Sequence, residues 1–401
     1  MDRKNSRGSS EIVPLELVAA RALSRAFKGW NMKGYLERTY AKLGIPDKAR
    51  PVIVGLIGGT ARNWMVLSKA LGMPYDKPRP STSYWLNLVL AYQALFRRVP
   101  ADRLEWAFKK FPRGTYLELL KSEPEDFLRD LTGEERERVH LSVPKWVWEE
   151  VKRVSDPKRF VEALDKRKGF WVRVRDPSII PYLRRKFLIR EGPFEDSLYL
   201  VGPKRDLIRE KLHPNKVVIM ELASMSIAYL AKGKRVLDLT SAPGGKAFHL
   251  KDKGFLVIAN DIDPTRFYFP VERVVSDARF PPFIKAFDTI ILDPDCSSIG
   301  RLNSPETRIL LPVVNKRKLS AYQRELIKGM LKLVRKGTRL VYSTCTVTYE
   351  ENEAHSPVLE EVAEPIDVDI ALPRGRKGWR HYLPDVHETI GFTFAVFEVT
   401  S

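Results

Sequence analysis

Only two cysteines occur among the 401 residues, and each directly follows an apolar run of strand length. Cys296 stands in LDPDCS after the run FDTII, and Cys345 stands in STCT after the run TRLVY. A single cysteine is most often a small buried residue without chemistry. Two cysteines at the ends of successive strands weaken that interpretation, because in an open parallel sheet ligands bind beyond the carboxyl ends of the strands.

Further candidate residues follow three earlier apolar runs. The first run, KRVLDLT, leads into a glycine-rich turn made of Ala242, Pro243, Gly244, Gly245 and Lys246. Such a turn lets backbone approach a ligand closely, and the next helix presents the positive end of its dipole. The next two runs end at Asp261 and Asp277, which suit the hydroxyls of a ribose and an exocyclic amine. The ordered set predicts a nucleoside cofactor and leaves a methyl donor and a dinucleotide open; alone, each feature also fits a generic turn.

Two thiols beside a nucleoside cofactor suit methylation of a pyrimidine. Carbon 5 of the ring is a weak nucleophile until a thiolate adds to carbon 6, and the activated carbon then attacks an electrophilic methyl group. This step needs a deprotonated cysteine and an acid near ring nitrogen 3, for which Asp293 is placed. The second thiol would assist release. The alternatives are a redox dithiol or a disulfide, and neither explains the cofactor motifs.

The elements that must position these residues form a regular series from residue 217 onward. The apolar runs are KRVLDLT, GFLVIAND, VERVVSDA, FDTIILDPD and TRLVYSTC. Their alternation with helical or loop segments predicts a parallel, doubly wound sheet, in which the fourth and fifth strands are neighbours.

The chain before this series predicts two further domains. Residues 11–112 have apolar positions at helical spacing, with Ser81 or Thr82 as a helix cap. Residues 141–212 mix helical patterns with the strand-like runs FWVRVR and SLYLV. We therefore expect a helical domain (1–138), a small α+β lobe (139–212) and a catalytic domain (213–401).

The net charge of +19, from 69 basic and 50 acidic residues, is unevenly distributed. Residues 1–100 contain 17 basic and 6 acidic groups, residues 101–150 contain 9 and 12, and residues 151–216 contain 18 and 9, which leaves only +2 for the remainder. A solubilising surface is the simpler explanation, whereas the asymmetry favours a nucleic-acid partner. The lobe carries a concentration of basic residues at Arg173, Arg175, Arg184, Arg185 and Lys186. The candidate phosphate contacts are the runs Lys316–Lys318 and Arg374–Lys377, which flank the active edge. Trp171 is either a base-stacking or a buried strand residue.

Several classes of protein are not expected from this composition. No uncharged apolar run approaches the ~18–20 residues that cross a bilayer, and MDRKNSRGSSEIVPLEL lacks the apolar segment of a signal peptide. We therefore expect a cytoplasmic protein with no membrane association. Two cysteines exclude a disulfide framework, and the spacing of the six histidines matches no metal motif, so no metal site is expected.

The motifs resemble those of the RsmB/Nop/Sun RNA cytosine-5 methyltransferases. The resemblance covers roughly residues 140–401, and residues 11–112 are similar, more weakly, to the NusB-like domain of RsmB-type members. The matching segments are Ala242–Lys246, Asp293-Pro294-x-Cys296-Ser297, Ser343-Thr344-Cys345 with Glu351-Asn352-Glu353, Ala223-Ser224, Gln323, and Gly391-Phe392 with Ala395.

The resemblance implies a Rossmann-like, S-adenosylmethionine-dependent methyltransferase domain preceded by an all-helical NusB-like domain and a small α+β RNA-binding lobe. By the same resemblance, Cys345 is the nucleophile, Cys296 assists product release and Asp293 hydrogen-bonds the cytosine. The residues implied to hold S-adenosylmethionine are Ala242, Pro243, Gly244, Gly245, Lys246, Asp261, Arg266, Asp277 and Asp293.

Some positions depart from the family pattern. Asp295 stands where proline is usual, Ser298-Ile299-Gly300 replaces Gly-Thr-Gly, and Arg175 replaces an asparagine. A carboxylate at Asp295, beside Cys296, is expected to raise the pKa of that thiol.

The expected function is transfer of a methyl group to carbon 5 of a cytidine in RNA by a monomeric enzyme. Ribosomal RNA is favoured over transfer RNA, because RsmB-type members carry the NusB-like domain. One alternative is a non-catalytic RNA-binding or ribosome-assembly factor that keeps the fold. Another is an amino-group methyltransferase, whose Asp-Pro-Pro-aromatic motif needs no nucleophilic cysteine.

Overall fold

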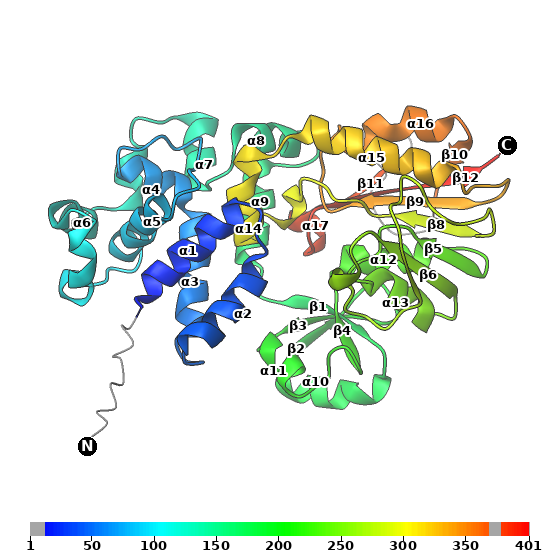
Figure 1. Ribbon diagram of the computed structural model, residues 1–401, viewed down its shortest axis with the longest axis horizontal. Coiled ribbons are helices and arrows are strands. Elements are labelled where there is room, and N and C mark those ends of the chain that lie inside the picture. The colour runs from blue at the N-terminus through cyan, green and yellow to red at the C-terminus, as the bar shows by residue number, and fades with distance from the viewer. Residues whose placement is uncertain (1–12, 369–377, 401) are drawn as a thin grey trace, which may run out of the picture. The chain divides into compact units, whose positions relative to one another are not determined.

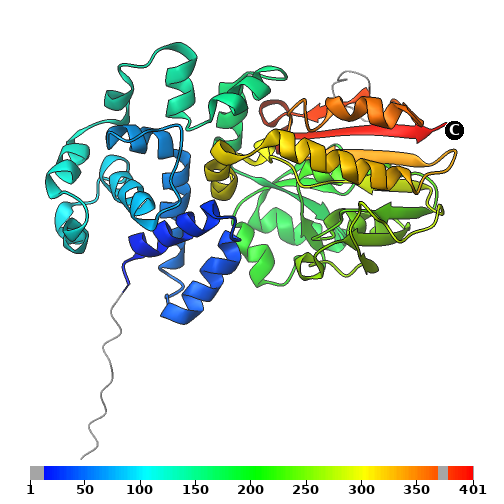
Figure 2. The ribbon, with the colours of Figure 1, turned by 45° about the horizontal axis from the view of Figure 1, so that its top comes forward.

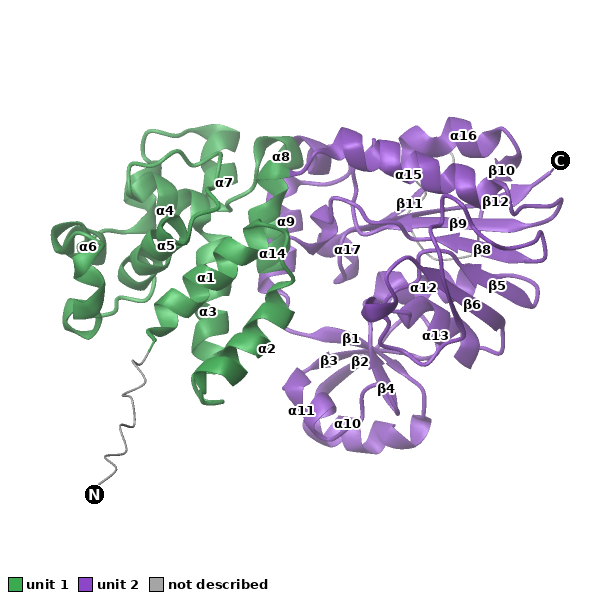
Figure 3. Ribbon diagram, in the orientation of Figure 1, with its two compact units in different colours: residues 1–148, 303–313 green, residues 149–302, 314–401 purple. Residues whose placement is uncertain are grey.

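The computed structural model describes residues 13–368 and 378–400, which divide into two compact units (Figure 3). Unit 1 extends to Trp148 and also contains Asn303–Val313, and unit 2 holds the rest. The helical unit thus extends beyond the expected end at residue 138, and the expected catalytic region contributes a segment to it. The basic run Arg374–Lys377 lies outside the described residues.

Unit 1 is helical throughout its described residues, as the sequence pattern predicted. Its elements are α1 (Leu15–Phe27), α2 (Met32–Leu43), α3 (Arg50–Arg62), α4 (Trp64–Ala70), α5 (Thr82–Leu95), η1 (Ala101–Lys109), α6 (Arg113–Lys121), η2 (Pro124–Leu128), α7 (Gly133–His140), α14 (Pro305–Leu310) and η6 (Leu311–Val313). Ser81 caps α5, since its Oγ accepts from the backbone N–H of Tyr84 at 3.2 Å. The segment 303–313 belongs to this core, because Ile309 of α14 is buried in it and Arg308 donates to the carbonyl of Leu141.

The division between the units falls within α8 (Lys145–Lys152), and unit 2 continues with α9 (Pro157–Lys166) and a small lobe. The lobe has an antiparallel sheet of order β2-β3-β1-β4, built from β1 (Phe170–Val174), β2 (Leu188–Glu191), β3 (Ser197–Val201) and β4 (Val217–Ile219). The helical elements η3 (Pro177–Ile179), α10 (Ile180–Lys186) and α11 (Lys204–Arg209) connect the strands (Figure 1). The runs FWVRVR and SLYLV are strands as predicted, but β4 extends the lobe's sheet beyond residue 212.

Two of the arginines that the sequence concentrates on the lobe have internal partners. Arg173 is buried and forms a 2.7 Å ion pair with Asp252. Arg175 pairs with the same carboxylate at 2.6 Å and covers the ring of Phe248. Trp171 is buried and donates to the carbonyl of Glu388 at 2.9 Å, which decides between its two interpretations in favour of the buried strand residue. These side chains hold the lobe to its neighbours in unit 2.

The second sheet of unit 2 has the order β10-β12-β9-β8-β5-β6-β7, with β11 paired to β12. Its strands are β5 (Arg235–Asp238), β6 (Leu256–Asp261), β7 (Arg273–Val275), β8 (Thr289–Leu292), β9 (Arg339–Thr344), β10 (Ala363–Pro365), β11 (Arg380–Tyr382) and β12 (Phe392–Val399). The first five are parallel, and β12 runs antiparallel to β9. The strand order reverses between β5 and β8, which is the switch point where ligands bind in such sheets.

Helices cover both faces of this sheet (Figures 1 and 2). On β8, Ile291 packs with α12 (Leu222–Leu230) and α13 (Gly245–Asp252), while Ile290 packs with α15 (Lys316–Leu331) on the other face. The strands are apolar on both sides for this reason. The remaining elements are η4 (Pro264–Arg266), η5 (Ile299–Arg301), η7 (Glu353–His355), α16 (Ser356–Glu360) and α17 (Pro384–His387). Within residues 13–368 and 378–400, no helix has the length and apolar character that crossing a membrane requires.

Candidate active site

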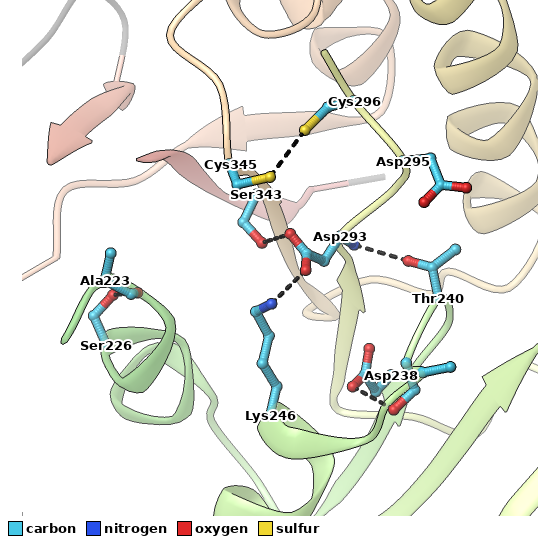
Figure 4. Close-up of polar contacts among 12 residues, drawn as sticks. Ala223, Ser226, Asp238, Thr240, Lys246, Asp293, Asp295, Cys296, Ser343 and Cys345 are labelled. Carbon is cyan, nitrogen blue, oxygen red and sulfur yellow. Dashed lines mark hydrogen bonds and ion pairs between the residues drawn. The ribbon is translucent and has the colours of Figure 1, made fainter. Parts of the chain in front are cut away.

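The two cysteines lie together just beyond the ends of β8 and β9 (Figure 4). These strands are adjacent and parallel, with Leu292 opposite Tyr342. The chain therefore reaches Cys296 and Cys345 at the same edge of the sheet, where their Sγ atoms are 3.3 Å apart. Both thiols are free. At this distance they share a hydrogen bond and titrate as a pair.

The pairing makes the two thiols unequal. The hydrogen bond from Cys296 lowers the pKa of Cys345 to about 7, an effect that outweighs burial and is reinforced by Arg301 and Ser298. The pKa of Cys296 lies well above its usual value, because of the hydrogen bond to Cys345, burial and the charge of Glu351. Cys345 is thus the thiol that ionises near neutral pH, as a nucleophile must.

Asp295 does not act on Cys296 as the sequence suggested. The pKa of Cys296 is raised as expected, but by Cys345, burial and Glu351. The Asp295 side chain is 72% exposed and lies 3.8 Å from the guanidinium of Arg266. Figure 4 shows its carboxylate turned away from both sulfur atoms. Water and Arg266 therefore screen its charge from the thiol.

Asp293, directly after β8, accepts hydrogen bonds from both sides. Ser343 Oγ donates to Oδ1 at 2.9 Å, Lys246 Nζ donates to Oδ2, and the backbone N–H of Asp293 donates to Thr240 Oγ1 at 2.9 Å. Burial alone would lower the pKa of Lys246, but Asp293 and Asp238 reverse the effect and raise it. The lysine therefore stays charged and links the glycine-rich turn to the cysteine edge.

Buried polar side chains hold the two cysteine loops in place. Glu351 is fully buried and accepts from the Ser297 N–H at 2.8 Å, Thr348 Oγ1 at 2.9 Å and Gln323 Nε2 at 3.2 Å. Gln323 also donates to the carbonyl of Asp295 at 2.9 Å. The segment after Cys345 thus fixes the loop that carries Cys296.

Five of the expected cofactor residues, Ala242–Gly245 and Asp261, lie together at a hydrogen-bonded turn at the start of α13. Asp261 accepts from the Ala242 N–H at 3.0 Å and the Asp263 N–H at 3.1 Å. Gly244 has φ of 93°, a conformation that disfavours other residues, and Gly245 then begins the helix. Asp261 therefore shapes the turn as well as standing beside it.

The other two expected cofactor residues, Asp277 and Arg266, are more exposed. Asp277 forms a forked ion pair with Arg279, at 2.6 Å to Nη2, and this hydrogen bonding lowers the pKa of the carboxyl group against the opposing effect of burial. Arg266 is half-exposed and its nearest acidic partner is Asp295. The ion pair with Arg279 fixes the orientation of the Asp277 carboxylate. Each carboxylate oxygen has a further lone pair that can accept a hydrogen bond from an exocyclic amine.

Sequence reasoning did not select Asp238, whose burial is the clearest sign of a missing partner. This side chain is 1% exposed, and its Oδ2 accepts from Ser241 Oγ at 2.7 Å. Its Oδ1 is buried without a hydrogen-bond partner, and burial raises the pKa to about 6. An acceptor of this kind beside a glycine-rich turn fits a cationic or donor group of a bound cofactor. The sequence feature that could have selected Asp238 is its position at the end of the first apolar run, like Asp261 at the end of the second.

In the basic run at the start of α15, the first residue has internal acidic partners, whereas Arg317 and Lys318 are exposed. Lys316 is bonded to Glu150 at 2.5 Å and to Glu350 at 2.8 Å. No group of three or more potential metal ligands occurs among the described residues.

Comparison with known proteins shows which enzymes this chain is similar to. Residues 226–397 match the family model of the 16S rRNA methyltransferase RsmB/F. The ribosomal RNA small subunit methyltransferase B of Klebsiella pneumoniae is 25% identical over 96% of this chain and 97% of its own length. The enzyme of the same name from Thermus thermophilus is 25% identical over 84% of both chains.

Solved structures agree on the fold. The crystal structure of PH0851 superposes with a TM-score of 0.73 at 21% identity, covering 96% of this chain and 99% of that one. The structure of NSun6 from Pyrococcus horikoshii gives 0.53 at 20% identity, over 64% and 98%. The catalytic part of the chain is thus similar to RsmB/F methyltransferases over residues 226–397. It is a methyltransferase of Rossmann-like fold that uses S-adenosylmethionine, as the resemblance implied.

Proposed function

We propose that this protein is a member of the RsmB/Nop/Sun family and methylates carbon 5 of a cytidine in ribosomal RNA through a covalent adduct with Cys345. The observation that carries the proposal is the 3.3 Å contact of the two thiols, together with the lowered pKa of Cys345. The names of the curated relatives supply the ribosomal substrate class. We accordingly propose a cytoplasmic protein with RNA as its partner.

In this proposal, Cys345, Asp293 and Cys296 each have a separate role in the reaction. The Cys345 thiolate adds to carbon 6 of the cytosine, which makes carbon 5 nucleophilic. Asp293, which accepts from Lys246 and Ser343, hydrogen-bonds the cytosine in this proposal. When carbon 5 loses its proton to a base, the sulfur leaves with the electrons of its bond to carbon 6. Cys296, at 3.3 Å from that sulfur, assists this elimination.

The cofactor lies on the glycine-rich side of Lys246 in this proposal. Bound there, S-adenosylmethionine supplies an electrophilic methyl group. The residues that hold it are the turn from Ala242 to Lys246, with Asp238, Asp261 and Asp277 at the ends of β5, β6 and the loop after β7. The orphan oxygen of Asp238 supports this assignment, because it is a buried acceptor awaiting a donor.

The test is to incubate the purified protein with cellular RNA and labelled S-adenosylmethionine and to map 5-methylcytosine. Cys345→Ala should abolish transfer, whereas Cys296→Ala should accumulate an RNA adduct that survives denaturing electrophoresis. The double variant is the matched control and should form no adduct. Full methyl transfer by Cys345→Ala would refute the covalent route, and RNA binding without any transfer by the wild type would favour an assembly factor.

An amino-group methyltransferase is the weaker alternative. Its motif has an aromatic residue at the position of Cys296, and its chemistry needs no second cysteine at Cys345. Mapping the label to an exocyclic nitrogen rather than to carbon 5 would support it.

A further inference from the structure

Ser298 adopts a backbone conformation that does not suit serine. Its φ of 59° and ψ of 29° lie in the left-handed region, where a side chain is disfavoured. It is the N-cap residue of η5, yet its hydroxyl makes no capping hydrogen bond. The usual reason for a serine at a helix start is therefore absent. Strain of this kind often marks a side chain that a functional site requires.

The hydroxyl of Ser298 faces the two thiols instead. Its Oγ accepts from Cys345 Sγ at 3.3 Å, lies 3.9 Å from Cys296 Sγ, and donates its proton to the carbonyl of Cys296 at 3.4 Å. A hydroxyl rotates freely and can donate in either direction. While Cys345 carries its proton, the Ser298 hydroxyl accepts from that thiol. When the proton leaves, the same hydroxyl can donate to the thiolate.

We propose that Ser298 is a positioning residue that donates a hydrogen bond to the Cys345 thiolate and so keeps the nucleophile ionised at neutral pH. The thiolate then has two donors, the Cys296 thiol and the Ser298 hydroxyl, both at 3.3 Å. The inference rests on the proposed function for the role of Cys345, but it concerns a property of the protein that exists without RNA.

Charged side chains near the two thiols also influence the pKa values of Cys345 and Cys296. Arg301 lowers the pKa of Cys345, while Asp293 and burial raise it. Lys246 is paired with Asp293, which lies between the lysine and Cys345 in Figure 4, and Glu351 acts on Cys296. Ser298 is the neutral donor in this set, so its removal changes hydrogen bonding without changing the charge of the site.

The experiment measures alkylation of Cys345 by iodoacetamide as a function of pH, read on the Cys345 peptide by mass spectrometry. Ser298→Ala and Ser298→Gly both remove the hydroxyl, and we expect both to move the midpoint of the curve about one pH unit higher. At pH 7 the alkylation rate should fall about fivefold, as the thiolate fraction falls. Methyl transfer should fall similarly at pH 7 and recover at pH 9.

The two variants separate this role from a structural one. Glycine relieves the backbone strain and alanine keeps it, so their unfolding temperatures should differ while their alkylation curves agree. Ser142→Gly is the matched control, because Ser142 also has a positive φ, of 52°, and lies in unit 1. It should leave the alkylation curve unchanged.

Two outcomes would overturn the inference. One is a wild-type midpoint in both Ser298 variants, and the other is a shift in the alanine variant alone, which would indicate strain rather than hydrogen bonding. Neither result bears on the proposed function. That proposal fails separately, if Cys345→Ala retains methyl transfer.

Discussion

Replacing Asp238 by asparagine should stabilise the protein at neutral pH. The carboxyl group is 1% exposed, and one of its oxygens has no hydrogen-bond partner. Its other oxygen accepts from Ser241 at 2.7 Å, a contact that an asparagine oxygen can keep. The substitution therefore removes a buried charge and preserves the shape of the side chain.

The magnitude follows from the pKa of Asp238. Burial raises it from 3.8 to about 6, so the folded protein binds this proton more tightly than the unfolded chain. The stabilisation that comes from binding this proton is fully present below the ordinary pKa of aspartate. It is lost as the pH rises through the folded-state pKa of about 6. The difference of about two pH units corresponds to about 3 kcal/mol above pH 6. Since 1 kcal/mol shifts the unfolding temperature by about 2–4 °C in domains of this size, the variant should unfold about 6–12 °C higher at pH 7.

The assay is thermal unfolding of both proteins between pH 4 and 7.5, with and without S-adenosylhomocysteine. The wild type should lose stability relative to Asp238→Asn between pH 4 and 6, and the two curves should then run parallel. The ligand should stabilise the wild type more, because the variant has lost the charged acceptor. Equal unfolding temperatures at pH 7, or a constant difference from pH 4 upward, would refute the reasoning.

Two other carboxylates should respond differently. Asp252→Asn should destabilise unit 2 by about 3–5 kcal/mol, because it leaves the buried Arg173 without its partner; unfolding at pH 7 measures this, and an unchanged transition would contradict the ion pair's role. Asp295→Asn should leave the pH dependence of Cys296 alkylation unchanged, because the carboxylate is 72% exposed and faces away from the sulfur; a curve moved to lower pH would show that its charge reaches the thiol.

Much of the candidate site could be predicted from the sequence, because the site residues lie at the ends of strands. The period of the apolar runs located β5, β6, β8 and β9, and the doubly wound order then made the last two neighbours. Once those strands are adjacent and parallel, Cys296, four residues after β8, and Cys345, directly after β9, reach the same edge of the sheet, where their thiols are in contact. No side-chain geometry was needed for that inference.

What the sequence could not show depends on partners distant along the chain. The amino-acid sequence of β1 does not reveal whether Arg173 and Arg175 face solvent or a buried carboxylate. Their partner, Asp252, lies 79 and 77 positions further along the chain. The proximity of Asp295 to Cys296 in sequence suggested an interaction that its direction in space prevents. Segment 303–313 looked like part of the catalytic domain, because local pattern does not reveal which core a helix joins.

These internal pairs also change how the positive charge of the lobe should be interpreted. Residues 151–216 contain 18 basic and 9 acidic groups, but a basic side chain that is buried against a carboxylate releases no counterions from RNA. Arg173 and Arg175 are of this kind. Arg184, Arg185 and Lys186, at the end of α10, are exposed and remain available to a phosphate backbone. If the lobe contacts RNA as we propose, the exposed basic residues of α10 are better candidates for that contact than the arginines of β1, which instead fix the lobe to α13.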